Sequence, residues 1–244
     1  MATETPLLAA EDVEKRFGAL VVLDGVDFAV GQHDAVGIVG PNGAGKTTLL
    51  NVLAGSERAN GGRVLFRGQD VTTIGPARLC RLGIGRAHQI PRPFGGMSVF
   101  ENVFVGASTG GGLGRHEAYR RCVDVLETCG MIELANRPAE SLGLLDRKRL
   151  ELARALATEP AVLLLDEIGA GLTDDEATAL VETIRELRER SIAIVWIEHI
   201  VHVLVQVVER LVCLNQGRVI ADGSPQEVMQ DAAVVDAYLG SAVA

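Results

Sequence analysis

The sequence lacks any long apolar segment. Its hydrophobic runs fall short of the roughly 18 consecutive apolar residues that a membrane-spanning helix needs. The N-terminal residues MATETPLLAAEDVEKRF contain no basic start followed by an apolar run, which a secretory signal peptide would require. We therefore predict a cytoplasmic chain in which no segment crosses a membrane.

A surplus of positive charge is also missing. The chain has 23 Lys and Arg residues against 32 Asp and Glu residues, which gives a net charge of −9. Proteins that bind nucleic acid through its phosphates need a basic surface, so we predict no nucleic-acid partner. The spacing of the four cysteines matches no zinc site, and we expect reduced thiols at Cys80, Cys122, Cys129 and Cys213.

Composition and segment order predict an α/β fold with a helical insertion. Of the 244 residues, 48% are hydrophobic and 28 are glycine, as in a globular chain. The apolar spacing from about residue 76 to 160 is helical, apart from a predicted flexible loop at 106–115. We expect a single domain, 1–244, with an α/β core at 1–88 and 160–244 and a helical subdomain at about 89–159. Expected core elements are strands at 35–40, 61–71, 161–167 and 191–199, a helix at 46–54 and a hairpin at 210–223.

The segment GPNGAGKTT fits the phosphate-loop pattern G-x-x-x-x-G-K-[ST] and lies between a predicted strand and a predicted helix. Glycines let backbone N–H groups approach phosphates, and the helix N-terminus adds a favourable dipole. The lysine reaches the β- and γ-phosphates of ATP, and the threonine hydroxyl that follows it binds Mg²⁺. The alternative is a glycine-rich turn. The expected ATP-binding residues are Gly40, Pro41, Asn42, Gly43, Ala44, Gly45, Lys46, Thr47 and Thr48.

Two acidic residues end the apolar run VLLLDE (162–167). A buried strand would deliver Asp166 to the phosphate loop, where its carboxylate can hold Mg²⁺ together with Thr47. Glu167, one step further, can act as general base for an attacking water. The alternative is an ordinary strand end with two solvated acids, and the upstream phosphate loop favours the catalytic interpretation.

At these two motifs the chain resembles the nucleotide-binding subunits of ABC transporters. GPNGAGKTT and VLLLDE match the family's Walker A and Walker B motifs, and further matches follow in the family's order over essentially the whole chain. The resemblance implies a P-loop NTPase core, built on a mixed sheet with an antiparallel edge, and an inserted α-helical subdomain. It also implies that the chain binds and hydrolyses ATP with Mg²⁺.

The resemblance assigns roles to three more residues. Phe17, in KRFGAL, matches the aromatic residue that stacks on adenine; its alternative is a core Phe. Gln89 matches the Q-loop glutamine, which binds Mg²⁺ and links the core to the helical subdomain; its alternative is a surface Gln. His199, after the strand IAIVWIE, matches the switch histidine that contacts the γ-phosphate and takes part in catalysis. Thr173 falls at the D-loop position, or it is a helix cap paired with Glu176.

The family's signature motif, commonly Leu-Ser-Gly-Gly-Gln, aligns with residues 142–146 (LGLLD). Gly143 stands where a hydroxyl usually contacts the γ-phosphate held by the other subunit. Its backbone and the following helix dipole would remain available to phosphate. Asp146 adds a negative charge that the next three residues, RKR, would offset. Alternatively, residues 142–145 simply pack the subdomain.

Whole segments narrow the resemblance to cassettes that serve importers of branched-chain or other hydrophobic amino acids. These are GIGRAHQIPRPFGGMSVFENVFVGA, RKRLELARALATEP and LNQGRVIADGSPQEVMQDAAVVDAYLG. We expect an ATPase subunit on the inner face of the membrane, docked to permease subunits through residues 90–102, where Phe94 and Met97 would be exposed; the alternative is that these two side chains pack in the core of the helical subdomain. Its other partners would be a second nucleotide-binding subunit, in a homo- or heterodimer, and indirectly a solute-binding protein. Alternatives are a soluble ABC-type ATPase and a weakly hydrolysing regulatory cassette.

Overall fold

The computed structural model describes residues 5–241; residues 1–4 and 242–244, which the predicted single domain includes, lie outside the described residues. The central six-stranded sheet has the order β10-β9-β3-β8-β7-β6. Five of its strands are parallel, and β10 pairs antiparallel with β9 at one edge. The predicted mixed sheet with an antiparallel edge is therefore confirmed. Its strands are β3 (Ala35–Val39), β6 (Ile84–Ala87), β7 (Val162–Asp166), β8 (Ala193–Ile197), β9 (Arg210–Asn215) and β10 (Arg218–Gly223).

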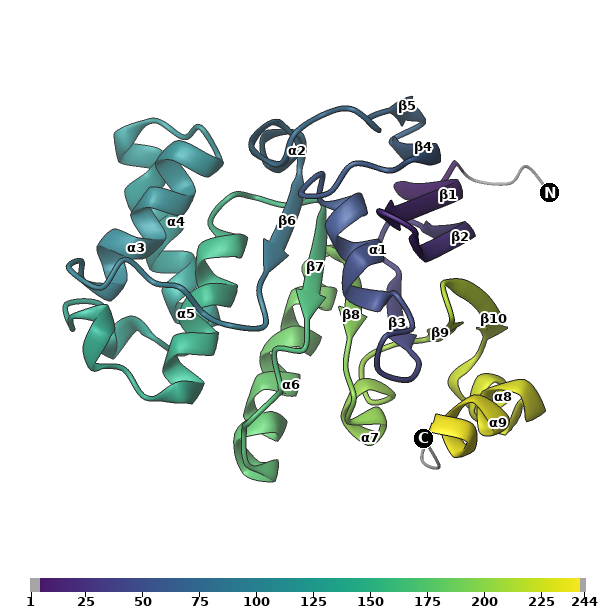
Figure 1. The fold of residues 1–244 in the computed structure, drawn as a ribbon. Coiled ribbons are helices and arrows are strands. Elements are labelled where there is room, and N and C mark those ends of the chain that lie inside the picture. The colour runs from purple at the N-terminus through teal and green to yellow at the C-terminus, as the bar shows by residue number, and fades with distance from the viewer. Residues whose placement is uncertain (1–4, 242–244) are drawn as a thin grey trace.

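A second, antiparallel sheet has the order β2-β1-β4-β5. Helix α1 (Lys46–Leu53) lies between the two sheets (Figure 1), and its buried Leu49, Leu50 and Leu53 belong to the hydrophobic cluster that joins them. The helix that carries the phosphate-loop lysine is thus held on both sides by apolar packing. The strands of this sheet are β1 (Leu8–Phe17), β2 (Leu20–Val30), β4 (Gly61–Phe66) and β5 (Gln69–Asp70).

The parallel strands are buried on both faces, as their continuous apolar runs predict. In β7, Val162 and Leu164 pack into the cluster around α1, whereas Leu163 and Leu165 pack into the cluster that includes α5 and α6. The alternation follows from the two-residue period of a strand. Burial on both faces leaves the carboxyl end of the strand as the place where polar side chains emerge.

Between β6 and β7 the chain is mostly helical and lies to one side of the central sheet (Figure 1). The structure differs from the expected pattern at two places. Ile84–Ala87 forms β6, because its backbone pairs with β7, although four residues are too few to show a strand period. The predicted flexible loop at 106–115 begins with a π-helical turn, Gly106–Gly110, that continues α3. The helices here are α2 (Pro76–Leu82), which precedes β6, α3 (Val99–Val105), α4 (Arg115–Thr128), two short 3-10 turns at Ile132–Leu134 and Ala139–Ser141, and α5 (Leu144–Leu156).

Close packing explains the glycine with which the π-helical turn begins. A Cβ added to Gly106 would lie 2.6 Å from the carbonyl oxygen of Arg154 in α5, so glycine lets the two backbones approach. Glycine-rich composition predicted flexibility here, but the same residues serve helix packing.

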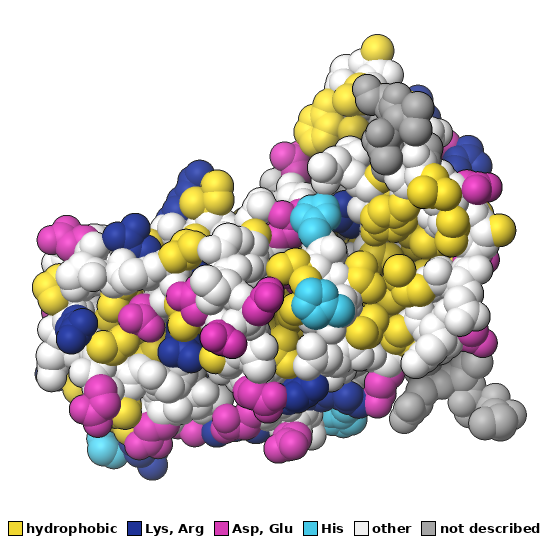
Figure 2. Space-filling view, turned by 90° about the horizontal axis from the view of Figure 1, so that it is seen from below, with side chains coloured by type: hydrophobic (Ala, Val, Ile, Leu, Met, Phe, Trp, Pro, Cys, Tyr) yellow, Lys and Arg dark blue, Asp and Glu magenta, His cyan; other side chains and the backbone are white. Residues whose placement is uncertain are grey.

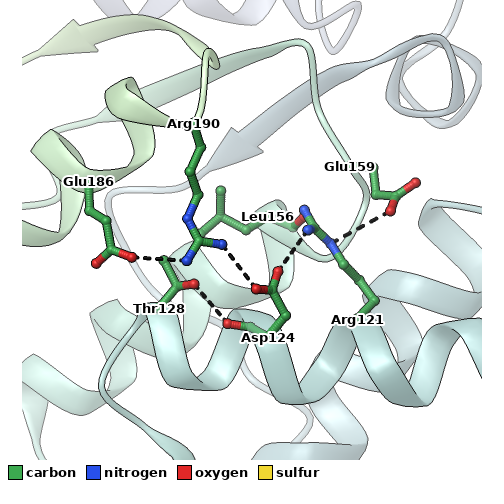
Figure 3. Close-up of polar contacts among 7 residues, drawn as sticks. All are labelled: Arg121, Asp124, Thr128, Leu156, Glu159, Glu186 and Arg190. Atoms are coloured by element: carbon green, nitrogen blue, oxygen red, sulfur yellow. Dashed lines mark hydrogen bonds and ion pairs between the residues drawn. The ribbon is translucent and has the colours of Figure 1, made fainter.

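An ion-pair network joins α4 to α6 (Asp174–Glu189), which lies against the central sheet (Figure 3). Arg190, directly after α6, lies 3.1 Å from Asp124 of α4 and 2.9 Å from Glu186. Arg121 contacts the other oxygen of Asp124 at 3.1 Å and donates to the carbonyl oxygen of Leu156. The helical region is thus tied to the core by polar contacts as well as by the apolar cluster.

Helix starts agree with the cap patterns in the sequence. Capping boxes form at Thr173 with Glu176 and at Ser224 with Glu227. Thr173 therefore caps α6, one of the two interpretations its position allowed. The remaining helices are α7 (Val201–Leu204), α8 (Pro225–Gln230) and α9 (Ala232–Ser241). Within residues 5–241 no helix combines the length and apolarity needed to cross a membrane.

Candidate functional site

The candidate site lies where parallel strands β3, β7 and β8 end. Because parallel strands deliver their carboxyl ends to the same edge, the segments after them come together. The phosphate loop follows β3, Glu167 follows β7, and His199 lies just beyond β8. Figure 2 shows the molecule from below, with acidic and histidine side chains near the centre of this view and hydrophobic side chains to the right.

The phosphate loop has the backbone conformation that its glycines predict. Gly40, Gly43 and Gly45 all have positive φ, at 140°, 78° and 104°. A Cβ on Gly45 would lie 2.7 Å from the carbonyl oxygen of Val22, so the loop is also tightly enclosed. The loop borders a cavity of about 190 Å³ lined by Val22, residues 42–48 and Glu167. Val22 is a lining residue that sequence reasoning missed.

Lys46 opens α1 and points back along the loop. Its ammonium group donates to the carbonyl oxygens of Gly40 and Pro41, at 2.7 and 3.0 Å. The residue is 6% exposed, and this burial lowers the pKa of Lys46, while Glu167 and Asp166 oppose the shift. Among the described residues the hydrogen-bond partners of this buried cation are neutral carbonyls, and an anion could replace them.

Asp166 meets the phosphate loop as predicted. Its Oδ1 lies 3.3 Å from the hydroxyl of Thr47, which donates to it. Its Oδ2 accepts a bond of 3.0 Å from Arg86 of β6, and Arg86 also donates to Asn51 of α1 at 2.6 Å. Sequence reasoning missed Arg86; the available signal was a lone charge inside the apolar run IGRA, three residues before Gln89.

The Glu167 carboxylate joins the other two predicted residues. Gln89 Nε2 donates to its Oε2 at 2.5 Å, and His199 Nε2 lies 2.8 Å from its Oε1. The Glu167 backbone is left-handed, with φ of 46°, and its N–H donates to the carbonyl oxygen of Ile197. This unusual conformation turns the side chain away from the strand direction and toward the loops.

Lys148 and Glu198 are charged residues buried beside the site. Lys148, 3% exposed, donates to the carbonyl oxygens of Gln89 and Glu167, each at 3.3 Å. Burial lowers the pKa of Lys148. Lys148 therefore does not pair with Asp146. Of the three basic residues expected to offset Asp146, Arg149 lies 3.8 Å from it.

Glu198, 2% exposed, accepts hydrogen bonds from the N–H groups of Gly169 and His199, at 2.6 and 3.1 Å. Burial raises the pKa of Glu198. Sequence reasoning missed it, although an acidic residue between a buried strand and a histidine is a signal. Its bonds hold the segments after β7 and β8 together.

Phe17 ends β1 and is 48% exposed, so it is not a core residue. The Lys15 ammonium lies 4.7 Å from the centre of its ring. Phe17 is absent from the described lining of the phosphate-loop cavity, but it pairs with Leu20 in the hairpin whose next strand carries Val22. Its ring thus has the exposure, though not the direct cavity contact, that adenine stacking calls for.

The signature segment is only partly core. Leu142 is buried, whereas Gly143 and Leu144 are exposed at the start of α5. Gly143 is the N-cap residue, with ordinary φ of −68°, and a Cβ added there would meet no atom of the described residues within 4 Å. The start of α5 therefore remains accessible, and a larger residue at Gly143 would fit without strain.

Comparison with known proteins agrees with these motifs. The ABC transporter family matches residues 23–170, and a family described as branched-chain amino acid ATP-binding cassette transporter matches residues 218–244. The chain is 36% identical to the high-affinity branched-chain amino acid transport ATP-binding protein LivG of Escherichia coli, over 97% of this chain and 99% of LivG. It is 34% identical to BraF of Pseudomonas aeruginosa, over 97% and 99% of the two chains.

Solved structures have the same fold. A crystal structure of the ADP conformation of MJ1267, an ATP-binding cassette of an ABC transporter, matches with a TM-score of 0.87 and 31% identity, over 97% of this chain and 99% of that chain. A nucleotide-free ATP-binding cassette matches equally well, with 31% identity over 96% and 99%. The family matches residues 23–170, and the identity to LivG extends over nearly the whole length of both chains. The chain therefore belongs to the ABC transporter family, as an ATP-binding cassette.

Proposed function

We propose that this chain is the ATP-hydrolysing subunit of an importer for branched-chain or other hydrophobic amino acids. The observation that carries the proposal is the meeting of the phosphate loop, Asp166, Glu167, Gln89 and His199 at one sheet edge. The relatives named for branched-chain amino acid transport, and the match of residues 218–244 to their family, support the substrate class.

ATP binding rests on the phosphate loop. Residues 40–48 would surround the phosphates with backbone N–H groups, and Lys46 would exchange its two carbonyl partners for phosphate oxygens. The exposed Phe17 would stack on adenine next to the hairpin that carries Val22. Lys46→Ala should abolish tight binding of ATP in a titration, because the phosphates lose their main cationic partner. Unchanged affinity would refute the phosphate-loop assignment.

The residues present fit a magnesium ion. Thr47 and Asp166 supply a hydroxyl and a carboxylate oxygen within 3.3 Å of each other, and Gln89 lines with Asp166 a cavity of about 330 Å³. Oxygen ligands of this kind suit Mg²⁺, which would neutralise charge on the β- and γ-phosphates.

Hydrolysis would use Glu167 and His199. Glu167 would accept a proton from water as the water oxygen forms a bond to the γ-phosphorus and the bond to the ADP oxygen breaks. In the structure both Glu167 oxygens already have partners, Gln89 and His199. A water would therefore have to replace one of these contacts before it reaches the base.

A second cassette would complete the site. The exposed start of α5, at Gly143 and Leu144, would face the γ-phosphate held by the partner cassette through backbone N–H groups and the helix dipole. In this division of labour, which we propose, residues 1–88 and 160–244 would supply the α/β core, and residues from about 89 to 159 would supply the helical subdomain that presents α5.

The chain would dock to permease subunits at the inner face of the membrane. Phe94 and Met97 are 43% and 38% exposed in the segment 90–102, and Asn102 holds this loop through bonds to Phe94 in both directions. An ordered loop with exposed apolar side chains suits a protein interface. A solute-binding protein would deliver the amino acid to the permease.

Reconstitution with its permease subunits in vesicles tests the proposal. We expect uptake of leucine, isoleucine or valine that depends on ATP, and loss of both uptake and hydrolysis in Glu167→Gln. Hydrolysis by the wild type no faster than by Glu167→Gln would refute the ATPase. Hydrolysis coupled to other solutes, with no uptake of hydrophobic amino acids, would refute only the substrate class.

A further inference from the structure

The last described helix, α9, touches the start of the phosphate loop. The hydroxyl oxygen of Tyr238 accepts a hydrogen bond of 2.8 Å from the N–H of Gly40, a residue 198 positions earlier. Gly40 is the first glycine of GPNGAGKTT. The contact therefore joins the C-terminal region to the element that would bind phosphate.

Gly40 has a constrained backbone. Its φ is 140°, and a Cβ would lie 2.0 Å from the carbonyl oxygen of Leu214 at the end of β9. A buried or half-buried N–H needs a partner, because leaving it without one costs free energy. Tyr238 supplies that partner for Gly40.

The rest of the C-terminal region flanks the same loop. The N–H of Gly217, in the β9–β10 turn, donates to the carbonyl oxygen of Ala44 at 3.0 Å. A cavity of about 390 Å³ lies between the loop and α9, lined by residues 41–44 and by Asn215, Gln216, Asp236 and Ala237. The loop is thus held at Gly40 and at Ala44 by segments that follow β9.

Helix α9 itself is docked by a small apolar contact. Val234 is 1% exposed and belongs to the large hydrophobic cluster, whereas Val235 and Leu239 are 42% and 64% exposed. Asp231 caps the helix by accepting from the N–H of Ala233 at 2.8 Å. Tyr238, on the same helix, is 36% exposed, so its ring is partly covered, and its hydrogen bond to Gly40 adds a polar contact to the docking of α9.

We propose that Tyr238 is a positioning residue for the phosphate loop, so that docking of α9 and binding of nucleotide phosphates favour each other. The inference rests on the proposed ATP binding. The Tyr238 hydroxyl fixes the Gly40 peptide, and thereby the direction in which the loop leaves β3. A ligand that binds only the ordered loop must also stabilise the docked helix, because such coupling is reciprocal. Burial raises the pKa of Tyr238 above its ordinary value, which further favours the neutral hydroxyl.

Tyr238→Phe in the full chain tests the proposal, because it removes the hydroxyl and keeps the ring. We expect the affinities for ADP and ATP, measured by titration calorimetry, to fall about 2- to 10-fold, the range of one lost hydrogen bond. In the assembled transporter the KM for ATP should rise by a similar factor with kcat unchanged. Amide hydrogen exchange at Gly40, followed by NMR, should become faster. A general loss of stability would instead speed up exchange at many residues.

Tyr119→Phe is the matched control, since Tyr119 is the other tyrosine of the chain and is 47% exposed on α4. Saturating ADP should slow amide exchange at residues 232–239 in the wild type and in Tyr119→Phe, and less in Tyr238→Phe. Unchanged ADP affinity and unchanged Gly40 exchange in Tyr238→Phe would overturn the proposal, as would equal changes in Tyr119→Phe. If the wild type binds neither ADP nor ATP, the proposed function is refuted. The exchange rate at Gly40 in Tyr238→Phe would still show whether Tyr238 holds the Gly40 peptide.

Discussion

His199 Nε2 lies 2.8 Å from Glu167 Oε1, and this contact joins the ends of two neighbouring parallel strands. The other oxygen of Glu167 accepts from Gln89 at 2.5 Å. The Glu167 side chain is 13% exposed and that of His199 is 44% exposed. The proposed base is therefore enclosed, while its histidine partner is accessible from outside the site.

We predict that Glu167→Gln lowers the single-turnover rate of ATP hydrolysis by about 10²- to 10⁴-fold, the usual contribution of a general base, with ATP affinity nearly unchanged. His199→Ala should also slow hydrolysis, because it removes a partner of Glu167. His202→Ala is the matched control, since His202 is exposed three residues further along. Equal rates in His199→Ala and His202→Ala would remove His199 from the site.

Lys148 should affect turnover more than binding. Its ammonium group donates to the carbonyls of both Gln89 and Glu167, so Lys148→Met should loosen their relative placement. We expect kcat of the assembled ATPase to fall about 10-fold, of the order of one charged hydrogen bond, with the KM for ATP unchanged. Lys148→Arg should restore part of the rate. Loss of affinity without loss of kcat would contradict this role.

Gly143→Ser should preserve or raise ATP-driven dimerisation. The site has room for a Cβ, and a serine N-cap would add a side-chain acceptor at the start of α5, which stabilises the helix by a few tenths of a kcal/mol over glycine. Gel filtration in a Glu167→Gln background measures the dimer. A marked loss of dimer would show that a hydroxyl at this position does not fit the partner site.

Glu198 should make stability depend on pH. Burial raises the pKa of Glu198 in the folded chain above its ordinary value of 4.5. At pH values between 4.5 and this raised pKa, the folded chain therefore binds more protons than the unfolded chain. The free energy of unfolding should therefore fall as pH rises from about 4.5 through the raised pKa. Glu198→Gln should lack this component. Denaturant unfolding of both proteins over this range tests the sign, and parallel pH profiles would refute it.

Local rules predicted much of the fold. The phosphate loop, its helix, strands β3, β7 and β8, the β9–β10 hairpin and the capping boxes at Thr173 and Ser224 follow from short-range patterns. The strand β6 did not, because its pairing with β7 decides it, and the π-helical turn at Gly106–Gly110, whose first glycine packs against Arg154, was not predicted either. Helix α9 was also missed, and its place beside Gly40 depends on segments far apart in the chain.

The sequence by itself determined the chemistry of the candidate site. The spacing in GPNGAGKTT, the acids after VLLL and the histidine after IAIVWIE predict an anion-binding loop, metal-type oxygens and a general base. Only the tertiary structure decided which charges meet: Arg86 with Asp166, Lys148 with two carbonyls rather than with Asp146, and Tyr238 with Gly40. These pairs form because burial and hydrogen bonding bring together segments that are far apart in the chain. Local sequence patterns, such as helix and strand periodicity, contain no information about them.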